Sequence, residues 1–90
     1  MPEQMILLRN ALEARHIDYI DDSDDLDRSF PFINMTIYRT KYVFKNRIWS
    51  VICGVGTFGA DYGLLELMID NNEPIGSLSA STILKMMDND

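Results

Sequence analysis

The sequence predicts an α+β fold, in which two terminal helices pack on one face of a small antiparallel sheet of four to five strands. Helical spacing of apolar residues at both ends and alternating β-branched and aromatic residues between them support this prediction. Ninety residues are enough for one small domain, so residues 1–90 are expected to form a single unit. A hydrophobic content of 47% favours a packed core over a disordered acidic chain.

The first helix is expected over residues 2–15. Pro2 suits the first helical turn, where its missing N–H is not needed. An apolar stripe recurs at intervals of three and four residues, and Arg9 is expected on another face. The stripe contains Met5, Leu8, Ala11 and Leu12. The last helix is expected over residues 80–88, with Ser79 as its N-cap.

The strands are expected at residues 17–20, 34–44, 48–53, 64–69 and 75–78. Residues 34–44 alternate, which places Tyr38, Tyr42 and Phe44 on one face and the cations Arg39 and Lys41 on the other. Residues 45–47 form the expected hairpin turn, since asparagine tolerates positive φ. The returning strand is nearly all apolar, which predicts a central place in the sheet.

Charge is segregated along this chain, whose formal net charge is −6. Six aspartates fall within residues 18–27, and the following 33 residues contain five cations and no acid. Segregation of this kind decides which partners a surface attracts. The aspartates are expected in a solvated loop, where their density resembles that of a phosphate backbone in sign and order of magnitude.

The acid-rich stretch is therefore a candidate binding site for a protein with a basic surface. Its candidate residues are Asp21, Asp22, Asp24, Asp25 and Asp27. The basic hairpin is a second candidate, either for nucleic acid or for the acidic stretch of another copy in a homodimer. Its candidate residues are Arg39, Lys41, Lys45 and Arg47. Nucleic acid is disfavoured, because sheet-based RNA readers need aromatics and cations on the same exposed face.

No catalytic, cofactor or metal signature accompanies these charges. The spacing Gly54-x-Gly56-x-x-Gly59 matches a dinucleotide-binding turn, but the strand-like residues 64–69 follow too soon for its helix. We expect a connecting or binding loop there, with Gly54, Gly56, Thr57, Phe58 and Gly59 as candidates. The aspartates lack the glycine and glutamate of an EF-hand. A single cysteine and a single histidine form neither a zinc set nor a nucleophile–base pair.

The sequence predicts neither a membrane-spanning helix nor a signal peptide. Residues 48–60, the longest run without a charge, are too short and too rich in glycine to span a bilayer as a helix. The first residues lack the basic region of a signal peptide. Together these features predict a cytoplasmic protein.

One resemblance covers roughly residues 38–80. The runs Tyr38–Phe44 and Trp49–Gly54, then Gly56-Thr57, Gly59 and Gly63–Glu66, resemble short uncharacterised proteins of phages and mobile elements in Gram-positive bacteria. The resemblance implies a mobile-element origin and carries no active site. The resulting hypothesis is a non-enzymatic interaction module, an inhibitor that presents acid to a basic host protein that binds nucleic acid. The alternative is a nucleic-acid or regulatory binding protein that uses residues 39–47.

Overall fold

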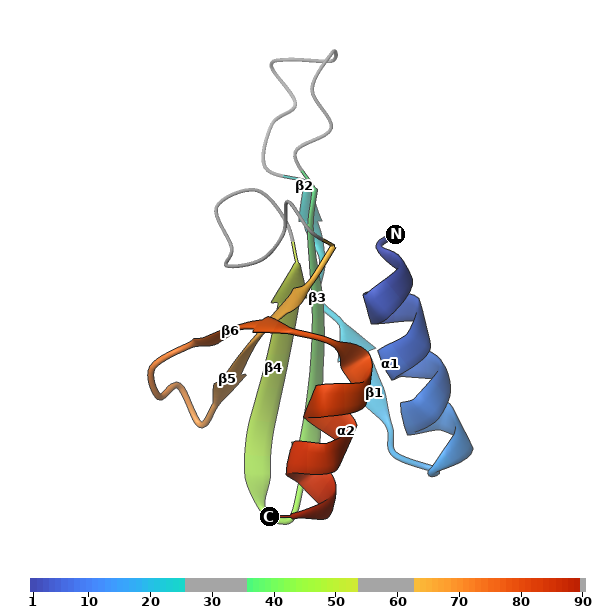
Figure 1. The fold of residues 1–90 in the computed structure, drawn as a ribbon, viewed down its shortest axis with the longest axis vertical. Coiled ribbons are helices and arrows are strands. Elements are labelled where there is room, and N and C mark those ends of the chain that lie inside the picture. The colour runs from blue at the N-terminus through green and yellow to red at the C-terminus, as the bar shows by residue number, and fades with distance from the viewer. Residues whose placement is uncertain (26–35, 54–62, 90) are drawn as a thin grey trace.

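A computed structural model describes residues 1–25, 36–53 and 63–89. Along the chain these form α1 (Glu3–Ala14), β1 (Tyr19–Asp21), β2 (Asp24–Asp25), β3 (Thr36–Phe44), β4 (Arg47–Cys53), β5 (Leu65–Ile69), β6 (Ile75–Leu78) and α2 (Ala80–Asp88), as Figure 1 shows. The predicted α+β class is confirmed.

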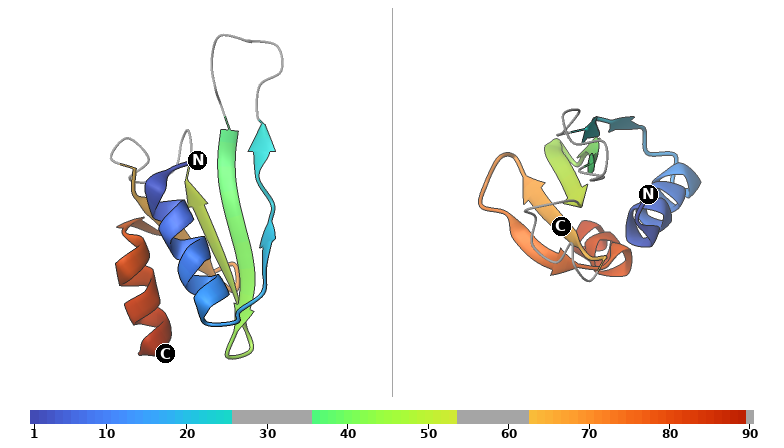
Figure 2. Two further views of the ribbon diagram at one scale, coloured as in Figure 1. Left: turned by 90° about the vertical axis from the view of Figure 1, so that its right-hand side faces the viewer. Right: turned by 90° about the horizontal axis from the view of Figure 1, so that it is seen from above.

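Five of the described strands form one antiparallel sheet in the order β1-β3-β4-β5-β6, and the two-residue β2 also pairs with β3. The apolar strand β4 is central, as its composition predicts. Both helices lie on the same side of the sheet, α1 over the β1 side and α2 beside it (Figure 2). Short connections join β3 to β4 and β5 to β6, which explains why these neighbours along the chain pair antiparallel.

The strand register decides which side chains meet the helices. Tyr42 lies opposite Trp49, and Thr40 opposite Val51, so this face of β3 and β4 points into the protein. Buried residues of both helices and of β3, β4 and β5 form one core (Met5, Leu8, Leu12, Tyr42, Trp49, Val51, Cys53, Leu65, Leu67, Ala80, Ile83 and Met87). We call the covered side of the sheet the inner face and the opposite side the outer face.

Two turns use residues that tolerate a left-handed backbone. Lys45 and Asn46 have φ of 49° and 65°, the two positive values of a type I′ hairpin turn between β3 and β4. Asp70 and Asn71 repeat this conformation after β5, where the Asn72 amide donates to the Ile69 carbonyl at 3.0 Å. The type I′ twist matches that of β3 and β4, which keeps this strand pair in register.

The C-terminal end of α1 is a Schellman motif with histidine in place of the usual glycine. The Ile17 amide donates to the Leu12 carbonyl at 2.9 Å and the His16 amide to the Glu13 carbonyl at 3.1 Å. His16 has φ of 59°, which strains a residue with a Cβ.

Replacement of His16 by glycine is expected to stabilise the protein by about 0.5–1 kcal/mol, because glycine adopts this φ without strain. Urea unfolding followed by circular dichroism measures the change. Alanine at the same position is the control, since it removes the imidazole but keeps the Cβ. If alanine stabilises as much as glycine, the imidazole rather than the backbone is responsible.

Candidate interaction surface

A buried arginine links α1 to the sheet beside the acid-rich stretch. The Arg9 side chain leaves the core-facing side of α1, and only 8% of the residue is exposed. Its Nε donates to Thr40 Oγ1 at 2.7 Å, and its Nη2 donates to Asp21 Oδ1 at 3.1 Å and to the Arg39 carbonyl at 3.2 Å. The guanidinium also lies over the Tyr19 ring, 5.6 Å from its centroid. Burial of this charge is tolerated because it has several partners.

Asp21 has a structural role that the sequence did not reveal. Its Oδ1 accepts from the Ser23 hydroxyl at 2.6 Å and from the Ser23 amide at 3.2 Å, in addition to Arg9. These bonds favour the ionised carboxylate, and the bond from Ser23, followed by that from Arg9, lowers the pKa of Asp21 below its ordinary value. The Ser23 hydroxyl in turn accepts from the Arg39 amide at 3.1 Å. Through Ser23 and Arg9, Asp21 therefore holds the end of β1 against β3.

Asp22 brings the two charged segments together within one chain. Its Oδ2 lies 3.3 Å from Arg39 Nη1 and 3.4 Å from Lys41 Nζ. The pairing follows from the register, in which β1 runs antiparallel to the part of β3 that carries both cations. Arg39 and Lys41 of the basic hairpin are thus paired with an aspartate of the acid-rich stretch inside the molecule.

The remaining candidate residues are distributed along the sheet. Asp24 and Asp25 form β2 and pair with β3, so this part of the stretch is a strand and not the expected solvated loop. Lys45 and Arg47 are exposed at the tip of the β3–β4 hairpin. Asp27 and the loop candidates Gly54, Gly56, Thr57, Phe58 and Gly59 lie outside the described residues. Among the candidates whose side chains the structure describes, Asp21, Asp22, Arg39 and Lys41 lie together, and Lys45 and Arg47 lie at the far end of β3 and the start of β4.

The outer face of the sheet instead carries exposed apolar side chains at one end. Ile20, Val43 and Ile48 are 67%, 66% and 51% exposed. Val43 pairs directly with Ile48, and Ile20 lies opposite Lys41, which places the three on adjacent strands. We call these three residues the outer patch. Neighbouring apolar side chains that remain exposed on a sheet are typical of binding surfaces.

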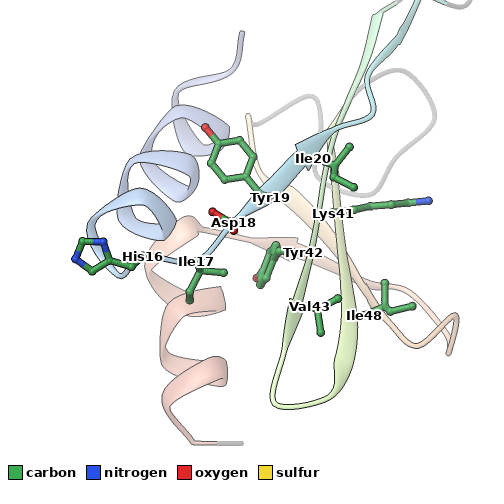
Figure 3. A pocket seen from close by; sticks show the side chains of 9 residues that line it. All are labelled: His16, Ile17, Asp18, Tyr19, Ile20, Lys41, Tyr42, Val43 and Ile48. Atoms are coloured by element: carbon green, nitrogen blue, oxygen red, sulfur yellow. The ribbon is translucent and has the colours of Figure 1, made fainter.

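A notch of about 670 Å³ curves around the edge of the sheet at this patch. Figure 3 shows that it lies between the segment that leaves α1 and the ends of β3 and β4. Its lining is mostly apolar, with Lys41, Asp18 and His16 as polar members. The full lining is His16, Ile17, Asp18, Tyr19, Ile20, Lys41, Tyr42, Val43 and Ile48. A concave, mainly apolar site with a few polar groups is the usual form of a binding pocket.

Other reactive groups in the described residues lie apart from this surface. Cys53 is buried in the core, and burial raises the pKa of its thiol. Within residues 1–25, 36–53 and 63–89, no three acid, histidine or cysteine side chains are grouped to hold a metal ion. None of the described helices has the length and apolar character needed to cross a membrane.

Sequence reasoning missed Arg9, Asp18 and the outer patch. Arg9 could have been found, because positions 5, 8, 9 and 12 follow the i, i+3, i+4, i+7 spacing of a single helix face. The prediction that Arg9 lies on another face was wrong for this reason. The outer patch had only a weak signal, the apolar Val43 on the same face of its strand as Arg39 and Lys41.

Asp21→Asn is expected to lower the free energy of unfolding by about 1 kcal/mol at pH 7, because the charge-assisted bond to Arg9 is lost from a carboxylate that is still half exposed. The lowered pKa means that Asp21 stabilises the fold above its unfolded pKa, near pH 4. This contribution is lost as the pH falls through the lower pKa of the folded state.

Urea unfolding of the wild type and of Asp21→Asn, at several values from about pH 7 to about pH 2, tests both statements. The difference between the two proteins is expected to vanish at the acid end. Asp18→Asn is the matched control, since it removes the same charge from a residue without a partner in the described structure. Equal effects of the two substitutions would contradict a structural role for Asp21.

Comparisons with protein-family models, curated proteins and solved structures find no match to this chain. The fold and the surface define the class of the protein as a small α+β domain whose sheet is covered by helices on one side and carries an apolar patch on the other. The resemblance to phage and mobile-element proteins gains no support from these comparisons.

Proposed function

We propose that this chain is a non-enzymatic protein-interaction module of the cytoplasm, which binds a basic partner protein through the end of the sheet that carries the outer patch. The observation behind the proposal is the exposure of Ile20, Val43 and Ile48 on a paired and therefore rigid part of the sheet. Burial of apolar surface is the main driving force of protein association. A patch on paired strands also binds with little cost in backbone ordering.

The charge of the chain supports a basic partner. With a net charge of −6, the protein attracts cations at long range and speeds their encounter. Inhibition of a host protein that binds nucleic acid is the specific form of this proposal, since such proteins carry basic surfaces. The acid would come from Asp24 and Asp25, which pair with the other end of β3, and from Asp27 close by in the sequence, because Asp21 and Asp22 are held by Arg9, Arg39 and Lys41. The partner would therefore extend along β3 from the outer patch to this acidic segment.

Two alternatives, nucleic-acid binding by the basic hairpin and a homodimer, have less physical support. Arg39 and Lys41 pair with Asp22, which weakens both a nucleic-acid site on the hairpin and a homodimer built from hairpin and acidic stretch. Sedimentation at low salt tests the dimer hypothesis directly. A monomer at high concentration would rule the dimer out.

Photo-crosslinking in the native host tests the proposed function. A benzoylphenylalanine residue at position 43 is expected to give a discrete crosslinked partner, whereas the same residue at position 75 is expected to give none. Ile75 is a suitable control because it is also an exposed apolar residue of the sheet but lies on β6. Ile20→Thr combined with Ile48→Thr keeps the β-branched shape and should abolish the crosslink at position 43. Equal crosslinking at both positions would contradict the proposal.

The triple variant Asp24→Asn, Asp25→Asn and Asp27→Asn tests the role of the acid. We expect weaker partner binding and a smaller dependence of binding on salt, because fewer charges take part in the encounter. Unlike a variant that includes Asp21, it spares the bond to Arg9. Glu3→Gln, Glu13→Gln and Glu73→Gln make a control of equal net charge. If the control weakens binding as much, net charge rather than this segment is responsible.

A further inference from the structure

The notch contains a stretch of strand with one open side. β1 pairs with β3 only between Thr40 and Tyr42, whereas β3 continues to Phe44. Beyond Tyr42, the described chain pairs β3 only with β4. Phe44 and Arg47 flank the two-residue turn as a hydrogen-bonded pair, so Val43 is the residue whose backbone N–H and C=O face the open side. An open strand edge can accept another extended segment by backbone hydrogen bonding. Val43 also contributes its side chain to the notch lining, so the open edge and the apolar pocket coincide.

Asp18 gives this notch a negative charge that nothing in the described structure offsets. It lies in the notch lining, and no described residue makes a hydrogen bond or ion pair with it. Lys41 is the cation of the lining, but its Nζ is paired with Asp22 Oδ2 at 3.4 Å, an acid that it shares with Arg39, and not with Asp18. The notch therefore combines apolar walls, an open backbone edge and one carboxylate.

We propose that the notch is where the partner docks, and that the docking element is an extended segment with apolar residues at alternate positions and a lysine or arginine that meets Asp18. This inference rests on the proposed function and names its site and the chemistry of its partner. The apolar side chains would contact Ile17, Ile20 and Val43, while the backbone pairs with the N–H and C=O of Val43 beyond the end of β1. Alternation fits the contact, because successive residues of a strand point to opposite sides.

The strand at the opposite edge of the described sheet, β6, is less suited to accept a docking strand. Between the pairs Leu65–Leu78 and Leu67–Ile75 the register shifts, and Ser77 in β6 has φ of 61°. A bulge of this kind interrupts the regular row of backbone groups that strand addition requires. Docking by strand addition is thus directed to the β1 side.

Titration of the ¹⁵N-labelled protein with two blocked hexapeptides, one of alternating lysine and valine and one of alternating glutamate and valine, tests the proposal by NMR. We expect saturable shifts of the amides of residues 17–20, 43 and 44 with the lysine peptide, and binding at least about ten-fold weaker with the glutamate peptide. Asp18→Asn should weaken the binding of the lysine peptide by about three-fold. Asp18→Lys should reverse the preference between the two peptides.

Glu73→Lys is the matched control for the charge reversal, because Glu73 is exposed in the β5–β6 connection and changes the net charge by the same amount. It should leave the preference unchanged. Shifts centred on Ile52 and Met68, equal binding of both peptides, no binding of either, or a reversal by Glu73→Lys would each overturn the docking inference. If any of these results occurs but position 43 still crosslinks to a partner in the native host, docking in the notch is overturned and the proposed interaction function stands.

Discussion

Trp49→Ala is expected to lower the free energy of unfolding by about 3–5 kcal/mol. Trp49 is 1% exposed on the central strand, its ring stacks on Tyr42 at 6.0 Å and it meets Phe44 edge-on at 6.1 Å. Truncation removes these contacts and leaves a cavity among residues of both helices and three strands. Since a chain of this size has a total stability of about 5–13 kcal/mol at typical per-residue values, this loss is a large part of the stability of the protein.

Urea unfolding followed by circular dichroism measures this loss, because Trp49 is the only tryptophan and its fluorescence disappears with it. Trp49→Phe is the control, with an expected loss of about 1–2 kcal/mol. It keeps an aromatic ring between Tyr42 and Phe44, and it removes an indole N–H that has no hydrogen-bond partner among the described residues. A loss below about 1 kcal/mol for Trp49→Ala would mean that the inner face of the sheet is wrongly assigned.

Arg9→Ala is expected to cost about 2–4 kcal/mol, the second largest effect. The substitution removes the donor to Thr40 Oγ1, which is fully buried, and the donors to Asp21 and the Arg39 carbonyl. It also leaves space beneath α1. Arg9→Lys keeps the charge without the planar fork that reaches these acceptors, so an intermediate loss is expected.

Arg15→Ala provides the comparison for Arg9→Ala. Arg15 follows the same helix and also pairs with an aspartate, Asp88, at 2.8 Å, but both side chains are exposed. Its loss should therefore cost less than about 1 kcal/mol. Thermal or urea unfolding of the three variants separates the effect of burial from that of ion pairing. Equal losses for Arg9→Ala and Arg15→Ala would contradict a buried structural role for Arg9.

Much of the fold could be predicted because its signals are local. The alternation in residues 36–44, the turn at Lys45-Asn46 and the N-cap Ser79 each act over a few residues. The Ser79 hydroxyl does accept from the Thr82 amide at 3.2 Å. The central position of β4 also followed from composition, since a strand covered by neighbours on both edges is the most buried.

The candidate site could be predicted only in part. The outer patch is apolar in the sequence, and alternation assigns Val43 to the same side as Arg39 and Lys41. Alternation does not say which side the helices cover. The charged residues, and not this apolar side, were therefore predicted to form the binding surface. The choice is made when α1 and α2 bury the side that carries Tyr42 and Trp49, which leaves Val43 and Ile48 outside.

The chain's composition and periodicity settle its class, its strand boundaries to within a few residues and the identity of its central strand, because backbone preferences and side-chain alternation act between near neighbours. The partners of its charges depend on tertiary structure. Asp22 meets Arg39 and Lys41 because of the β1–β3 register, and Asp21 meets Arg9 because α1 packs against the sheet, so these contacts join residues that are 12 to 19 positions apart. Charge patterns along a sequence carry no information about such contacts, since Coulomb interactions depend on distance in space and not on order in the chain.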